Sequence, residues 1–584
     1  MHLALPFMPS LLAKELIELA AVRRTYVLRT LYAVGLFAVF LATSYRQLVA
    51  LDAGEMGILG TGGSLFNSLM VLQFCGIYLF LPLLVAPLVC EEDERGTLDL
   101  LMVSGISPLA FLLQKLFSRL IGMGSFLLLA LPISGMAYAL GGVSETQIIA
   151  GVISLSLCCL QVGSVALWCG ARAHGTMNAV TSAYLLGPVM LFIAAPAAHL
   201  IPMLLSSVIF EREWSHGGFI IPMSLYYRAE QYSARNTVVE TSEMLLAGLP
   251  IFLSAVGFVA LAWRALLHRS KTMSPTMRRQ MQIYRPGLQF ERHRRQRVVA
   301  MAADLETLPD KQPLAWRELR RTPLFRAEHR SRSILVLVVL ACLTAFFLLA
   351  TAGNNPSRVI NSTFTVFGHG VYLTAIPLIA IVATGLMSGE RKRNSLEILL
   401  LTPLAGHDLI NQKLAGCHRL IWLAMTLITL FAGIIFLAAS AELTSELTAW
   451  LRLPFTIITA WVYLHLTMWV AMAVSLKMRV QTQATVTILA LIAAWVALPL
   501  LAVSLIDDLT HLNLKESYWL DLLSPVSAII DDGKYAEHYE GRPSQSLSLW
   551  LNRMVINLCW YGGIWWLVRR HCLKLADTLL GRSC

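Results

Sequence analysis

Long apolar runs alternate with short charged segments along nearly the whole chain. A helix that crosses a bilayer needs about 20 mainly apolar residues, and about twelve runs of this kind occur. In the first half they lie near residues 30–45, 66–90, 116–140, 146–170, 179–209 and 245–267. In the second half they lie near residues 333–352, 364–388, 415–440, 448–476, 483–506 and 549–568. The pattern predicts an all-α integral membrane protein with about 12 transmembrane helices.

One charged segment occurs twice, each time between the second and third apolar runs of its half. Its copies, residues 92–101 and 390–399, are related by one gapless offset of 298 residues. Matching pairs at this offset are Glu92 with Glu390, Arg95 with Arg393, Thr97 with Ser395, Leu98 with Leu396, Gln114 with Gln412, and Lys115 with Lys413. Such a repeat indicates duplication of a membrane unit. We expect two pseudo-symmetric six-helix repeats, residues 1–267 and 314–584, joined by a basic linker over residues 268–313.

Composition and charge agree with a membrane location. Hydrophobic residues make up 57% of the chain and charged residues 14%, while a soluble domain is usually about 45–50% apolar. The formal net charge is +11, and the basic residues gather at the N-terminal stretch, the linker and the C-terminal tail. Cytoplasmic loops of membrane proteins carry this excess of Lys and Arg. The distribution therefore predicts cytoplasmic termini and a cytoplasmic linker, and it accounts for the charge without a nucleic-acid partner.

Motifs of enzymes and metal sites are absent from the sequence. No GxxxxGK[ST] phosphate-binding loop, HExxH motif or GxSxG motif occurs, so the chain has no ATP site of its own and no predicted catalytic residue. The ten cysteines form no CxxC pair and mostly lie inside apolar runs. We interpret them as small buried residues, so no metal site is predicted.

Each half begins with a short amphipathic segment before its first apolar run. In the first half Leu12, Leu16 and Leu19 alternate with charged residues that include Glu15. The corresponding segment of the second half is residues 314–319, in which Glu318 matches Glu15 at an offset of 303. Both segments are typical of helices that lie along the cytoplasmic membrane interface, although an ordinary solvated helix before a span is the alternative.

The repeated charged segment has the features of a helix start at the membrane surface. In each copy a helix breaker, Gly96 or Asn394, precedes a hydroxyl residue, and an acid follows two residues later at Asp99 or Glu397. A Ser or Thr N-cap and an acid in the first turn both favour a new helix. Its leucines, which are Leu98 and Leu101 in one copy and Leu396 and Leu399 in the other, would contact a hydrophobic groove of a partner. The following Ser107 and Pro108 predict the start of the next helix.

This arrangement resembles the membrane-embedded permease subunits of type 2 ABC transporters, the class that consists mostly of exporters. The resemblance covers both halves, so the chain looks like two permease units fused together. It implies export across the plasma membrane of a bacterium, driven by two separate cytoplasmic ABC ATPase subunits that bind ATP and Mg²⁺. The residues that it implies for ATPase coupling are Glu92, Arg95, Gly96, Thr97, Leu98, Asp99, Leu101, Glu390, Arg393, Ser395, Leu396, Glu397 and Leu399.

The two copies differ in the charge just before the helix breaker. Asp93 and Glu94 in the first copy correspond to Arg391 and Lys392 in the second. If both copies contact ATPases, this change of sign predicts two different ATPases, or one ATPase bound with unequal strength. The alternative is that both clusters only mark the solvated end of a span.

We single out one polar residue inside the fourth predicted span of each half. They are Gln161 and His465, and a polar or ionisable group inside a membrane is a candidate for the transport pathway. For the lone His465, a hydrogen bond to a neighbouring helix is the alternative. Membrane lipid is the other expected contact of the spans.

Two other functions fit the duplicated architecture. A secondary transporter built from parallel repeats also has matched halves, but it usually carries buried acids or broken helices at the midplane, and acids within these spans are scarce. A membrane scaffold without transport activity is the other alternative. The transported substrate does not follow from the sequence.

Overall fold

The computed structural model describes residues 10–21, 26–41 except 28 and 39, 62–98, 100, 106–187 except 174, 241–271, 312–321, 356–440 except 393–395, 397–398, 400 and 402–403, 447–510 except 479, and 543–579. Within these ranges the regular structure is helical and no strand occurs. The helices are α1 (Ser10–Ala21), α3 (Gly62–Val85), α4 (Pro87–Glu94), α6 (Pro108–Leu128), α7 (Leu131–Ala139), α8 (Glu145–Arg172), α11 (Thr241–Lys271), α14 (Pro313–Arg321), α16 (Pro356–Lys392), α18 (Gly406–Lys413), α19 (Ala415–Ser440), α20 (Leu447–Lys477), α21 (Gln481–Thr510) and α25 (Pro543–Leu579).

Several of these helices are long and apolar enough to cross a membrane. Among the described residues there are five such spans, or six if the bent pair α18 and α19 forms one span. They are Gly62–Glu94, Pro108–Ala139, Glu145–Arg172, Gly248–His268 and Pro454–Lys477. The chain is therefore a membrane-embedded helical protein. The count of twelve stays a prediction, and of the predicted spans 333–352 lies outside the described residues, as does most of 179–209.

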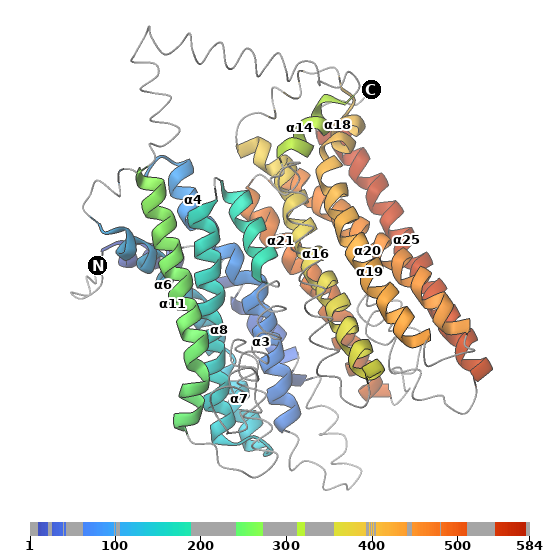
Figure 1. Ribbon diagram of the computed structural model, residues 1–584, viewed down its shortest axis with the longest axis horizontal. Helices are drawn as coiled ribbons and strands as arrows, with labels where there is room; N and C mark the ends of the chain where they lie inside the picture. The colour runs from blue at the N-terminus through green and yellow to red at the C-terminus, as the bar shows by residue number, and fades with distance from the viewer. Residues whose placement is uncertain are drawn as a thin grey trace. The chain divides into compact units, whose positions relative to one another are not determined.

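The chain divides into two compact units. The first comprises residues 1–92, 101–263 and 489–560, and the second comprises residues 93–100, 264–488 and 561–584. In the first unit α3, α6 and α8 pack against one another, and in the second unit α16, α19 and α20 do the same (Figure 1). These are the second, third and fourth predicted spans of the two halves. The same three-helix packing thus occurs twice.

In each unit the second predicted span lies very close to the fourth near the end that carries the charged segment. A Cβ atom added to Gly170 of α8 would lie 2.3 Å from the Ala86 carbonyl oxygen, so only glycine fits there. In the second unit the Ser475 hydroxyl donates to the Thr384 carbonyl at 2.7 Å, joining α20 to α16. In the first unit the absence of a side chain at Gly170 allows the two helices to approach. In the second unit the Ser475 hydrogen bond joins them.

The third predicted span of the first half begins before its apolar run, and that of the second half follows a bend. The helix of the first unit starts at Pro108, where the Ser107 hydroxyl accepts from the Ala110 N–H at 3.2 Å, so the predicted start at Ser107 and Pro108 is confirmed. The span therefore begins well before residue 116. In the second unit α18 and α19 meet at a bend of 40° next to Leu414, which the sequence pattern did not indicate.

Candidate functional site: two matched ion clusters

In the first unit, three helices meet at a buried lysine. Lys115 of α6 donates to the Glu15 carboxylate of α1, and it donates to the Glu92 carboxylate of α4 at 2.7 Å. Arg119, one turn further along α6, contacts the other Glu15 oxygen at 3.3 Å. We call Glu15, Glu92, Lys115 and Arg119 the first cluster.

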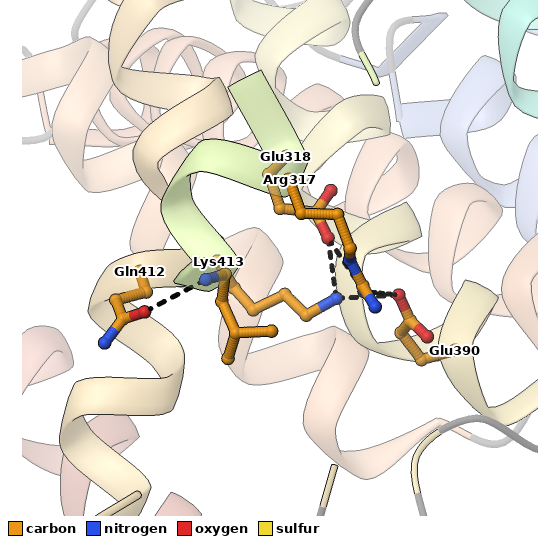
Figure 2. A network of polar contacts seen from close by, with 6 residues as sticks. Arg317, Glu318, Glu390, Gln412 and Lys413 are labelled. Carbon is orange, nitrogen blue, oxygen red and sulfur yellow. Dashed lines mark hydrogen bonds and ion pairs between the residues drawn. The ribbon is translucent and has the colours of Figure 1, made fainter. Parts of the chain in front are cut away.

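The second unit contains the same arrangement, which Figure 2 shows from close by. Lys413, at the end of α18, contacts Glu318 of α14 and Glu390 of α16 at 2.7 Å each. The Lys413 side chain is fully buried. Arg317 lies 2.6 Å from Glu390 and 3.3 Å from Glu318. Arg317, Glu318, Glu390 and Lys413 form the second cluster.

Gln412 adds one contact beside the second cluster. Its side-chain oxygen accepts from the Leu314 backbone N–H at 3.3 Å. The first N–H groups of a helix have no partner within the helix, so this bond satisfies one of them at the start of α14. Gln412 and Lys413 together hold the short helix against the third predicted span.

The positions of the two acids on the short helices differ from the expectation. The sequence pattern put Leu12, Leu16 and Leu19 on the apolar side of an interfacial helix, with Glu15 elsewhere around it. In the structure Leu11 and Glu15 are buried in α1, and Leu314 and Glu318 are buried in α14. Residues four apart share a helix face, so each short helix presents a leucine and a glutamate together. Glu15 and Glu318 are buried because pairing with a lysine far away in the sequence outweighs the usual exposure of a charge.

The charges of each cluster balance. Two carboxylates face one lysine and one arginine, so the formal sum is zero in both units. Taking charges out of water costs several kcal/mol per ion, and removal of one partner from a buried pair typically costs about 3–5 kcal/mol. The helices that meet at each cluster are therefore joined by contacts that resist separation. They are α1, α4 and α6 in the first unit and α14, α16 and α18 in the second. In the second unit the arginine comes from α14, and in the first it comes from α6.

Beyond Glu92 the chain leaves the first cluster through a left-handed turn. Gly96 has a φ of 71°, which side chains disfavour, and its N–H donates to the Asp93 carbonyl at 3.1 Å. Arg95 is exposed, and Thr97 is half-buried. The predicted helix breaker thus coincides with an actual break in the helix.

The leucines of the repeated segments divide into buried and exposed ones. Leu98 and Leu399 are buried, with exposed fractions of 7% and 6%, and Leu396 is half-buried. By contrast Leu100 is 70% exposed, and Leu401, two residues beyond the second copy, is 86% exposed. In and next to the repeated segments, the exposed leucines among the described residues are therefore Leu100 and Leu401, which were not among the expected coupling residues. Five of the expected coupling residues lie outside the described residues: Asp99, Leu101, Arg393, Ser395 and Glu397.

Arg391 makes its contacts inside the second unit. Its guanidinium donates to the Leu476 carbonyl at 2.8 Å and to the Met478 carbonyl at 3.0 Å, both at the C-terminal end of α20. The last carbonyls of a helix lack internal partners and carry the negative end of the helix dipole. One of the two basic residues that distinguish the second copy therefore caps a helix.

The two polar residues inside the fourth predicted spans have neighbours within their own units. The Gln161 amide donates to the Ser254 hydroxyl at 2.9 Å, which joins α8 to α11. The His465 ring lies with its centroid 4.3 Å from that of Trp461 and 5.6 Å from that of His418. For Gln161 the contact is a hydrogen bond between two helices of the first unit. A pathway role for either residue stays a prediction.

Sequence reasoning did not identify Glu15, Lys115, Glu318, Lys413, Arg119 or Arg317 as site residues. A signal was present, since Glu15 and Glu318, Glu92 and Glu390, and Lys115 and Lys413 are identical in the two copies. Charged residues that survive in both copies of a mainly apolar repeat are good candidates for a shared contact. A comparison with known protein-family models found no match, and a comparison with curated protein sequences found none either.

Proposed function

We propose that this chain is the membrane-embedded part of an ATP-driven export system of the type 2 ABC permease class, with both permease units fused in one chain. The observation that carries the proposal is the pair of matched clusters. In each unit a buried lysine ties the end of the second predicted span to the short N-terminal helix and to the third predicted span. ATP and Mg²⁺ would be bound by two separate cytoplasmic ATPase subunits.

The clusters supply a route for mechanical coupling. The exposed Arg95 and Leu100 follow Glu92 by a few residues, so a partner that moves this segment displaces the Glu92 carboxylate. Movement of the Glu92 carboxylate also moves Lys115 and α1, because separating the buried charges is unfavourable. In the second unit Glu390, Lys413 and α14 have the same relation. Motion that begins at the cytoplasmic surface thereby reaches the second and third spans of both units.

This proposal places the chain in the bacterial plasma membrane with both termini in the cytoplasm. The basic linker and the basic C-terminal tail support that orientation. The absence of a phosphate-binding loop from the sequence supports a separate motor protein.

Purification of the tagged full chain from its native membrane tests the proposal. We expect an ATPase with a phosphate-binding loop to copurify, and we expect its ATP hydrolysis in proteoliposomes to change when the chain is omitted. Recovery of the chain with no ATPase, together with substrate movement driven by an ion gradient, would instead establish a secondary transporter. Recovery with other partners and no substrate movement would establish a scaffold.

A further inference from the structure

A cavity of about 410 Å³ lies within the first unit between α3, α6, α7 and α8. Its inner wall is mainly apolar and includes Phe66, Met70 and Leu155. Around its edge Leu128, Leu131 and Val152 are exposed apolar side chains on membrane-spanning helices. Exposed apolar side chains of a span face the hydrocarbon of the bilayer, so the cavity is open to lipid rather than to water.

Two buried polar side chains line this cavity, Gln73 and Ser134. Gln73 of α3 is only 4% exposed, and no described group forms a hydrogen bond with its amide. A buried amide without a partner is unfavourable, and nearly all such groups in folded proteins are paired. A ligand with a hydrogen-bonding group would provide the missing partner.

The serines of the cavity have their hydroxyl hydrogens in use. Ser125, Ser134 and Ser156 donate to carbonyl groups one turn earlier in the chain. Each hydroxyl oxygen can still accept a bond, but only Gln73 offers free donor hydrogens within the described lining. The chemistry of the cavity therefore favours an apolar molecule that carries a carbonyl or a hydroxyl group.

We propose that this cavity binds a mainly apolar molecule that enters sideways from the bilayer and accepts a hydrogen bond from Gln73 through a carbonyl or hydroxyl oxygen. The volume is near the lower end of the range of small-molecule sites, which is about 300–1,000 Å³, so one narrow ligand fills it. Gln73 lies midway along α3, far from the lipid headgroups, which separates this ligand from an ordinary phospholipid with its polar groups at the surface.

The site belongs to the first half of the chain. At the offset of 298 residues, Gln73 corresponds to Val371, and Gly124, which lines the cavity, corresponds to Trp422. At the matching positions the second half therefore has neither the amide of Gln73 nor a residue as small as Gly124. The inference goes beyond the proposed function, because binding from the bilayer needs neither ATP nor an ATPase.

Photolabelling of the purified full chain in lipid nanodiscs, without ATP and without an ATPase, tests the inference. The probes are a diazirine-bearing long-chain ketone with its carbonyl near mid-chain and an alkane of the same length with the same diazirine. We expect saturable ketone labelling of peptides from α3, α6 and α8. Gln73→Leu should reduce ketone labelling by about five-fold, which corresponds to the loss of one hydrogen bond, and should leave alkane labelling unchanged.

A second test compares a variant that fills the cavity without changing Gln73 with a control variant outside the cavity. A Cβ added to Gly124 meets no atom within 4 Å, so Gly124→Leu has room to grow into the cavity and should reduce labelling by both probes. Gly257→Leu on α11 also enters open space but lies outside the cavity lining, so labelling should not change. If Gly124→Leu does not fold, Ser156→Leu takes its place. Labelling that is not saturable, or that is equal in all variants, would overturn the inference, whether or not an ATPase partner is found.

Discussion

At the scale of single residues, the defining feature is one lysine shared by two carboxylates in each unit. Lys413 is fully buried, and its two acids come from helices more than 70 residues apart in the chain, at Glu318 and Glu390. Such a lysine is tolerated inside a protein only because its charge is paired. The lysine stabilises the fold only when all members of its cluster are present.

Removal of the lysine alone should therefore destabilise the second unit. We expect Lys413→Met to lower the free energy of unfolding by about 3–5 kcal/mol, because two buried carboxylates lose their shared partner. Lys14→Met is the control, since Lys14 and Glu18 form an exposed pair 3.7 Å apart whose loss should cost under about 1 kcal/mol. Chemical unfolding in detergent, followed by circular dichroism, measures both.

Removing the acids together with the lysine separates the charge effect from a packing effect. The triple variant Glu318→Gln, Glu390→Gln and Lys413→Met has no buried carboxylate left, and its remaining charge, Arg317, is 41% exposed to solvent, so the variant should recover much of the lost stability. An equal loss in the single and triple variants would mean that the lysine acts through packing and not through charge.

At the scale of helices, the close approach of the second and fourth spans depends on one missing side chain. Gly170→Ala places a Cβ atom 2.3 Å from the Ala86 carbonyl oxygen, and backbone cannot easily move away. We expect a loss of about 1–3 kcal/mol in the free energy of unfolding. Gly257→Ala on α11 meets nothing within 4 Å and should stabilise its helix by about 0.5–1 kcal/mol. The free energy of unfolding of both variants is measured in detergent. A change of the same sign in Gly170→Ala and Gly257→Ala would contradict this account.

The end of α20 gives a second prediction at this scale. Arg391→Gln removes the charged donor that bonds the carbonyls of Leu476 and Met478. The last turn of α20 should fray, so its amide hydrogens should exchange with solvent about ten-fold faster, as expected for the loss of about 1.5 kcal/mol. Lys477→Gln removes an equal charge from the same turn and is the control. Equal exchange in both variants would show that only the charge matters.

The sequence predicted those helix features that depend on neighbouring residues. The breaker at Gly96 and the helix start at Ser107 and Pro108 are local, and both occur in the structure. The inward orientation of Glu15 and the bend beside Leu414 were not predicted. Both involve residues distant in the chain or the fit between packed helices, which periodicity within one segment does not contain. The cluster residues were visible as identities between the two copies, but their meeting in space was not.

At the scale of the whole molecule, the matched packing of three helices in each unit agrees with a duplicated membrane protein.

The orientation in the membrane has a direct test. In a background without the ten native cysteines, a cysteine at Glu145, at the start of α8, should react with an impermeant thiol reagent in intact cells. A cysteine at Thr578, at the end of α25, should react only after the cells are opened. The reverse pattern would contradict the predicted cytoplasmic C-terminus and, with it, export in the proposed direction.

The central claim is that the repeated charged segments receive force from an ATPase, and the exposed leucines give its most direct test. The measurement is ATP hydrolysis by the copurified ATPase in proteoliposomes that contain either the native chain or the variant Leu100→Asp with Leu401→Asp. Both side chains are exposed, so the variant should insert and fold normally. The account predicts that the chain-dependent part of ATP hydrolysis falls at least about ten-fold, because each charge enters an apolar contact and together they cost more than about 1.4 kcal/mol. Unchanged hydrolysis with the correctly folded variant would contradict it.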